Sequence, residues 1–169
     1  IQSAGLKMDL ERSEKKSLKE YKIASWVNED IAPVNQEVQN RILKVSKTIS
    51  DAGGKVDFEA RPDFDLLEAM NTYQSLLLPT MSSRAGDDEY NLLKERVEKL
   101  DPTDNSESAN TLRKQISSLR DYNRANNDRT HLRWKWHEFF KEYDAIITPV
   151  MATEAFDHNH ANYGERTIM

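Results

Sequence analysis

The fold is decided by residues 118–150, which read SLRDYNRANNDRTHLRWKWHEFFKEYDAIITPV. Ser118 followed by Asp121 is a helix-start signature. Beyond it, apolar residues recur at the spacing of one buried helix face. They are Leu119, Tyr122, Leu132, Trp136, Phe139, Phe140 and Tyr143. The period then changes to the short apolar run 145–147, which Pro149 stops. The stretch therefore predicts a buried helix followed directly by a buried strand.

A strand, a helix and a second strand are expected near the start of the chain. Residues 22–27, KIASWV, form a short apolar run suited to a buried strand. Asn35 is placed to cap the following helix, and Gly53-Gly54 to end it in a left-handed conformation. The apolar stripe of that helix is Val34, Val38, Ile42, Val45 and Ile49. Residues 55–60 return to a period of two, so the unit predicts a parallel crossover.

Three more helices are expected between this unit and the long helix. Asp63 or Asp65 caps the first, and Pro79 ends it. The polar connector 101–108 separates the second from the third. The buried face of the first helix is expected to be Leu66, Met70, Tyr73 and Leu77. The second helix is marked by Tyr90, Leu93, Val97 and Leu100, and the short third one lies around Leu112 and Ile116.

The order of these elements predicts one α/β module over residues 1–169, with a small parallel or mixed sheet and several packing helices. Residues 1–19 are mostly polar without a sustained period, which indicates a loop leading into the fold. A sheet of three strands is thin for a free-standing protein. We therefore expect it to be part of a larger sheet.

Composition narrows the classes of function. The chain has no cysteine, which excludes a disulfide framework, a thiolate metal site and a cysteine nucleophile. Its formal net charge of -5 argues against a main role in binding polyanions. No apolar run approaches the roughly 20 residues that cross a bilayer. We expect a cytoplasmic protein with neither nucleic acid nor a membrane as partner.

Several short motifs follow one another along most of the chain. They are Tyr21-Lys22-Ile23-Ala24 to Pro33-Val34, Ala52-Gly53-Gly54-Lys55-Val56, Arg61-Pro62-Asp63-Phe64-Asp65-Leu66, Asn123-Arg124-Ala125-Asn126-Asn127, Leu132-Arg133, Trp136, Phe139-Phe140, Tyr143-Asp144-Ala145-Ile146-Ile147-Thr148-Pro149, Ala155-Phe156 and His158. In this order they resemble the back half of the amidase-signature family of hydrolases, and the resemblance covers most of the chain. The resemblance implies a serine hydrolase of linear amides, whose nucleophile a lysine activates through a second serine in a cis peptide. It implies no metal and no organic cofactor.

The glycine- and serine-rich segment that carries the family's chemistry is not found in this sequence. The nearest stretch, residues 82–86 (SSRAG), lacks the flanking glycines and falls where a helix is expected to end. Five glycines in 169 residues is also few for a chain that builds nucleophile and oxyanion loops. We therefore assign no catalytic residue, and expect a fragment without the Ser-Ser-Lys core.

Two further groups of side chains could indicate metal binding or nucleic-acid binding, and we favour neither function. Asp157, His158 and His160 include possible metal ligands, but a further ligand at a recognisable spacing is missing, so no metal is expected. A basic and aromatic helix could bind nucleic acid, or could be a solvated face balanced by acidic residues, which we favour. Its residues are Arg113, Lys114, Arg120, Arg124, Arg129, Arg133, Lys135, Trp134 and Trp136.

The residues most suited to lie near a ligand follow the last strand. They are Thr148, Pro149, Val150 and Met151. In open α/β sheets, ligands bind beyond the carboxyl ends of strands. The resemblance also implies that this region borders the acyl pocket. The alternative is a structural strand exit without contact to substrate.

These observations favour the structural and substrate-covering portion of an amidase-like enzyme. Its partners would be the remainder of the parent enzyme and, in that parent, a small amide. The alternative is a free-standing, non-catalytic α/β binding or interaction module. The identity of the amide and the oligomeric state are not marked in the sequence.

Overall fold

A computed structural model of the chain describes residues 2–3, 6–7, 13–162 and 165–166. It groups into two compact units, which we call the sheet unit (Ile1–Arg61 with Phe140–Met169) and the helical unit (Pro62–Phe139). Five α-helices and a three-stranded parallel sheet among the described residues confirm the predicted α/β class. That residues 1–169 form one domain stays a prediction.

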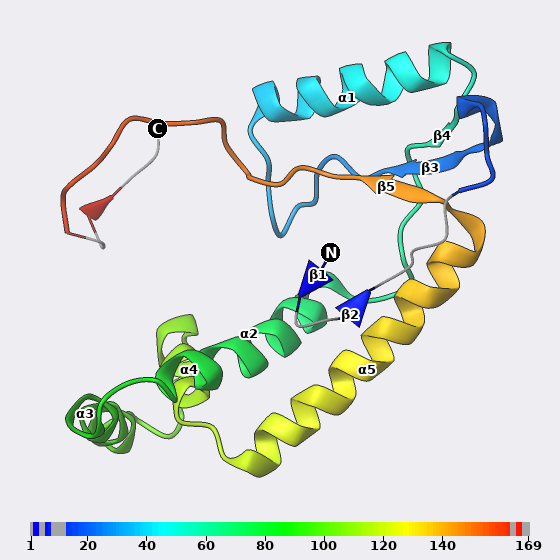
Figure 1. Cartoon of the computed structure of the whole chain (residues 1–169). Helices are drawn as coiled ribbons and strands as arrows, with labels where there is room; N and C mark the ends of the chain where they lie inside the picture. The colour runs from blue at the N-terminus through cyan, green and yellow to red at the C-terminus, as the bar shows by residue number, and fades with distance from the viewer. Residues whose placement is uncertain (1, 4–5, 8–12, 163–164, 167–169) are drawn as a thin grey trace. The chain divides into compact units, whose positions relative to one another are not determined.

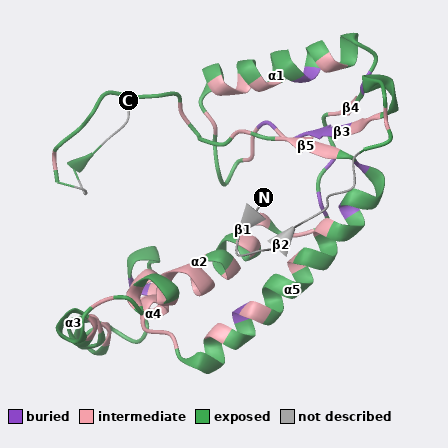
Figure 2. Cartoon of the chain, in the orientation of Figure 1, coloured by how far each residue is buried: buried purple, intermediate pink, exposed green. Residues whose placement is uncertain are grey.

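The sheet unit is built on three short parallel strands in the order β4-β3-β5 (Figure 1). They are β3 (Lys22–Ser25), β4 (Lys55–Asp57) and β5 (Ala145–Ile147). Ile23 of the central strand pairs with Val56 on one side and Ala145 on the other. Figure 2 shows buried residues on this central strand, where Ile23, Ala24 and Ser25 are each at most 7 % exposed. The predicted strands exist, but β3 and β4 end earlier than the expected runs 22–27 and 55–60.

Helix α1 (Gln36–Asp51) connects β3 to β4 and begins and ends as the sequence predicts. The Asn35 side chain accepts the backbone N–H of Glu37 at 2.7 Å. At the other end Gly53 adopts a φ of 93°. There the N–H of Gly53 donates to the Ser50 carbonyl at 2.8 Å, and the N–H of Gly54 to the Ile49 carbonyl at 2.9 Å. These two bonds form a Schellman motif, which satisfies carbonyls that the helix end leaves open.

The face of α1 that meets the sheet differs from the predicted stripe. Val45 is 45 % exposed, whereas Ser46 is fully buried. The Oγ atoms of Ser46 and Ser25 lie 2.8 Å apart, so each hydroxyl finds a partner inside the unit. Small side chains at this contact let the helix approach the strand closely, which turns Val45 to the edge of the interface.

The carboxyl end of α5 (Leu119–Glu142) is fastened to the sheet by Tyr143. The Tyr143 hydroxyl donates to Asp57 Oδ2 at 2.6 Å, and the Lys22 ammonium lies 4.3 Å from the centre of the ring. The hydrogen bond from Tyr143, with those from the backbone N–H groups of Glu59 and Ala60, lowers the pKa of Asp57. The same bond raises the pKa of Tyr143. The pair joins the end of the helix to β4.

The chain before β3 is not the continuous loop that the sequence predicts. Gln2–Ser3 (β1) and Leu6–Lys7 (β2) pair as antiparallel strands, and Leu18–Glu20 forms a short 3-10 helix, η1. Ser17 and Glu20 form a complete capping box around η1, a local signal that the prediction overlooked. The remaining predicted loop positions 1, 4–5 and 8–12 lie outside the described residues.

The helical unit contains three further helices and most of α5. They are α2 (Leu66–Ser82), α3 (Asp87–Glu98) and α4 (Glu107–Gln115). The Asp65 side chain caps α2 by accepting the N–H of Glu68 at 2.8 Å, and Ser118 Oγ accepts the N–H of Asp121 at 3.1 Å at the start of α5. These starts confirm the predictions from sequence. Among the described residues, no helix is long and apolar enough to cross a membrane.

Helix α2 departs from its prediction in length and orientation. It passes through Pro79 and ends at Ser82, and the N–H of Ser83 bonds to the Pro79 carbonyl at 2.9 Å, which closes the last turn beyond the proline. Met70 and Tyr73, expected to be buried, are 40 % and 63 % exposed. Polar groups join the helix to α4. Lys114 Nζ donates to the side-chain oxygens of Asn71 and Gln74, both at 2.8 Å.

The predicted buried face of α5 is wrong at two positions. Leu119 is 75 % exposed and Phe140 is 46 % exposed, while Phe139 is buried as expected. Leu119 is the first residue of the helix, so it has no preceding turn to pack against. Ala125 was not assigned to the face, yet it is only 6 % exposed.

We predict that Gly53→Ala lowers the free energy of unfolding by about 1–2 kcal/mol, because an L-residue at a φ of 93° is strained. The new Cβ would also lie 2.8 Å from Lys19 Cγ, which has to move. Gly86→Ala is the matched control, since Gly86 has a φ of -66° and a new Cβ there meets no heavy atom within 4 Å. Alanine is less favoured than glycine at this N-cap of α3, but it lowers the entropy of the unfolded chain, so stability should change by less than about 0.5 kcal/mol. Urea denaturation of the 169-residue chain measures both. Equal effects would contradict the argument.

We predict that Tyr143→Phe destabilises the chain by about 1 kcal/mol at pH 7, the usual contribution of one hydrogen bond. The folded-state pKa of Asp57 lies below the ordinary 3.8, so its contribution is present above pH 4 and is lost as the pH falls through the folded value. The difference between the native chain and the variant should therefore shrink in acid. Tyr90→Phe is the control, and should show no such pH-dependent difference. A Tyr143→Phe effect that is constant from pH 7 to pH 3 would exclude this role for Asp57.

Candidate functional site

The candidate site lies where the three parallel strands end. Parallel strands bring their carboxyl ends to the same edge of a sheet, and α/β proteins bind ligands beyond that edge. Trp26 follows β3, Phe58 follows β4 and Thr148 follows β5. The backbone N–H of Trp26 donates to the Ile147 carbonyl at 2.9 Å, which holds the ends of β3 and β5 together.

The four residues predicted to lie near substrate leave β5 at this edge. Val150 is 96 % exposed and Met151 is 62 % exposed, so two apolar side chains are in contact with solvent. The segment is anchored just beyond them, because the N–H of Asn35 donates to the Ala152 carbonyl at 2.7 Å. Thr148 and Pro149 form the link between the strand and this anchor. Their contact with a substrate stays a prediction.

A polar and aromatic cluster at the same edge was not identified from sequence. The Trp26 indole N–H donates to Glu29 Oε1 at 2.7 Å, and Arg61 Nε donates to the same oxygen at 3.0 Å. The Arg61 guanidinium lies 5.2 Å from the centre of the Trp26 ring. Arg61 also donates to the carbonyls of Phe58 and Ala60, at 3.2 Å and 2.9 Å. The position of Trp26 directly after a parallel strand is the signal that could have revealed it.

The serines nearest to the family's catalytic pattern bond to the backbone. Ser82 Oγ donates to the carbonyls of Gln115 and Pro79, and Ser83 Oγ donates to the carbonyl of Thr80 at 2.8 Å. The part of the chain that the structure describes contains no serine hydroxyl bonded to a lysine or histidine side chain. This geometry gives neither serine an activating base.

The histidines near the end of the chain do not gather further ligands. The rings of His158 and His160 stack with centroids 6.2 Å apart, and both residues are exposed. Within residues 13–162 and the other described positions, no three His, Cys, Asp or Glu side chains form a group that could hold a metal ion.

Several basic side chains of α4 and α5 form hydrogen bonds or ion pairs within the helical unit. Arg113 donates to the carbonyls of Asp101 and Asp104 at 2.9 Å and 2.6 Å, which holds the connector before α4. Lys135 Nζ bonds to Asp63 Oδ2 at 2.5 Å, and this bond lowers the pKa of Asp63. Trp134 is 66 % exposed and contacts His137 edge-on. That the helix binds no nucleic acid stays a prediction.

The parallel sheet, its helical crossover and the open carboxyl edge define an α/β protein with a candidate site beyond its strands. Compared with models of known families, residues 3–169 match the model described as Amidase. The chain belongs to the amidase family. No curated protein and no solved structure matches it.

Proposed function

We propose that this chain is the structural and substrate-covering portion of an amide hydrolase, in which the carboxyl edge of the sheet borders the pocket for the acyl group. The observation that carries the proposal is the exposure of Val150 and Met151 where β5 ends. An apolar acyl chain gains free energy by covering such side chains. Membership of the amidase family supports a carboxamide as the substrate class.

The remainder of the parent enzyme would supply the Ser-Ser-Lys core. In the proposed reaction a serine oxygen of the parent attacks the amide carbonyl, the C–N bond breaks and the amine leaves with a proton. Water then cleaves the acyl ester, which releases the acid and restores the serine. The proposal involves no metal, no organic cofactor and no nucleic acid or membrane partner, and it places the enzyme in the cytoplasm.

The edges of the small sheet support the idea of a larger parent. Among the described residues, β4 and β5 each have a strand neighbour on one side only. Unpaired edges expose backbone N–H and C=O groups, and parallel sheets are usually covered on both faces. Further strands from the parent would pair with these edges.

We predict that the protein made from its native gene has an intact mass well above 19.6 kDa and hydrolyses linear amides, whereas the 169-residue chain alone does not. Mass spectrometry and release of ammonia or amine measure the two quantities. A native mass of 19.6 kDa without hydrolysis would favour the free-standing binding module. A burst of product from the 169-residue chain, abolished by Ser82→Ala or Ser83→Ala, would overturn the assignment of the chemistry to the parent.

Within the active native protein, we predict that Val150→Ala raises KM for amides with longer apolar acyl groups. The expected change is about threefold to tenfold, since removing two methyl groups from an apolar contact costs about 1 kcal/mol. Acetamide, which has a single methyl as its apolar part, should be little affected. Val45→Ala, at an exposed position of α1, is the control and should leave KM unchanged. An equal loss for short and long acyl groups would place Val150 outside the acyl pocket.

A further inference from the structure

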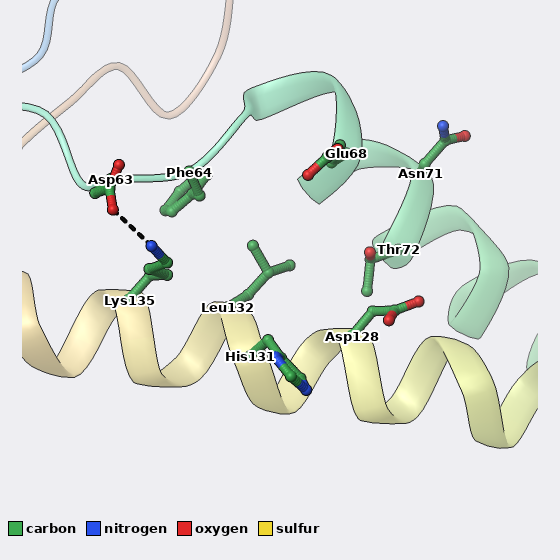
Figure 3. Close-up of a pocket in the computed structure, with 9 residues that line it drawn as sticks. All are labelled: Asp63, Phe64, Glu68, Asn71, Thr72, Asp128, His131, Leu132 and Lys135. Atoms are coloured by element: carbon green, nitrogen blue, oxygen red, sulfur yellow. Dashed lines mark hydrogen bonds and ion pairs between the residues drawn. The ribbon is translucent and has the colours of Figure 1, made fainter.

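A groove lies inside the helical unit, between the start of α2 and the middle of α5 (Figure 3). Its volume is about 590 Å³, within the range of about 300–1,000 Å³ that is usual for small-molecule sites. The groove is lined by Asp63, Phe64, Glu68, Asn71, Thr72, Asp128, His131, Leu132 and Lys135. All of them belong to the helical unit, so the groove is complete without the sheet unit.

The groove has an apolar floor held by aromatic packing. Phe64 and Leu132 are half-buried and supply its apolar surface. The ring of Phe64 lies 5.4 Å from that of Trp136, which in turn meets Phe139 edge-on at 5.8 Å. Phe139 is only 8 % exposed. This chain of aromatic contacts fixes the position of the floor.

Negative charge without a counter-ion lies on both walls. Glu68 projects from α2 and Asp128 from α5 (Figure 3). Among the described residues, neither carboxylate has an ion-pair partner. The third acid, Asp63, is already paired with Lys135 at one end of the groove. The charge that remains available is therefore that of Glu68 and Asp128.

Polar groups of α2 complete the wall beside these carboxylates. Asn71 Oδ1 accepts from Lys114 Nζ at 2.8 Å, which leaves the amide N–H groups of Asn71 to donate elsewhere. Lys114 itself is not among the lining residues, and it also bonds to Gln74. Thr72 of α2 also lines the groove (Figure 3) and adds a hydroxyl.

We propose that this groove binds a small organic cation, a primary ammonium on an apolar body. The ammonium lies between Glu68 and Asp128, and the body covers Phe64 and Leu132. Charge complementarity selects this class of ligand, because an anion would meet two carboxylates and a neutral molecule would desolvate them without compensation. The inference is independent of amide hydrolysis, since it concerns the helical unit alone.

The first test compares three probes of one shape on the 169-residue chain. Phenethylammonium, 2-phenylethanol and 3-phenylpropionate carry a positive, a zero and a negative charge on the same phenyl-ethyl body. Titration followed by ¹H–¹⁵N NMR gives each dissociation constant and the residues whose signals move. We expect phenethylammonium to bind about tenfold more tightly than the alcohol, the combined effect of two exposed ion pairs, and the acid not to bind.

Variants then test which carboxylates are responsible. Glu68→Gln and Asp128→Asn are each expected to weaken phenethylammonium binding about threefold, and together about tenfold, while binding of the alcohol is unchanged. Glu98→Gln, an exposed carboxylate on α3 outside the groove, is the matched control and should have no effect. Circular dichroism confirms that each variant is folded.

Several results would overturn the proposal. The ammonium and the alcohol could bind equally, which would show that the groove recognises only the apolar body. Glu98→Gln could weaken binding as much as Glu68→Gln, which would indicate a general effect of net charge. Signals of Phe64 and Leu132 could stay in place while others move, which would locate binding elsewhere. Absence of binding by phenethylammonium would overturn it directly.

Discussion

The structure depends on the pairing of β3 along both of its sides. Ala24 at its centre is completely buried, so the backbone groups of this strand need partners within the protein. β4 comes from the next part of the chain, but β5 comes from about 120 residues later. Pairing with β5 also brings Asp144 to β3, where its N–H donates to the Lys22 carbonyl at 2.8 Å. One short strand thus fixes where the long helix must end.

The same pairing creates the candidate site. Because all three strands are parallel, their exits meet at one edge, where the Arg61 guanidinium lies near the Trp26 ring and the exposed Val150 follows β5. This edge combines a rigid polar cluster with an open apolar segment. The proposed acyl pocket rests on this combination of a hydrogen-bonded cluster and an exposed apolar segment, and on membership of the amidase family.

The helical unit is held together differently from the sheet unit. Among its described residues, few apolar side chains are buried, the largest being Phe139. Helix α2 is fixed to α4 by the ammonium of Lys114 and by the hydroxyl of Ser82, which donates to the Gln115 carbonyl. Polar contacts of this kind fix helices at a few points and leave space between others. The groove between α2 and α5 is such a space.

The sequence by itself determined the helix ends and strands that are marked by nearby residues. It also determined the family, which the order of the motifs along the chain indicates. Asn35, Gly53, Asp65 and Ser118 mark helix ends because each acts on backbone groups within a few residues. The edge at which Thr148 emerges was also predictable, since a period change marks the strand before it. Only the tertiary structure decided which residues are buried and which meet. Ser46 replaces Val45 at the sheet, and Tyr73 turns outward, because the neighbouring element sets the rotation of a helix. The bonds of Tyr143 with Asp57 and of Arg61 with Glu29 join residues 86 and 32 positions apart, a separation over which local propensity carries no information.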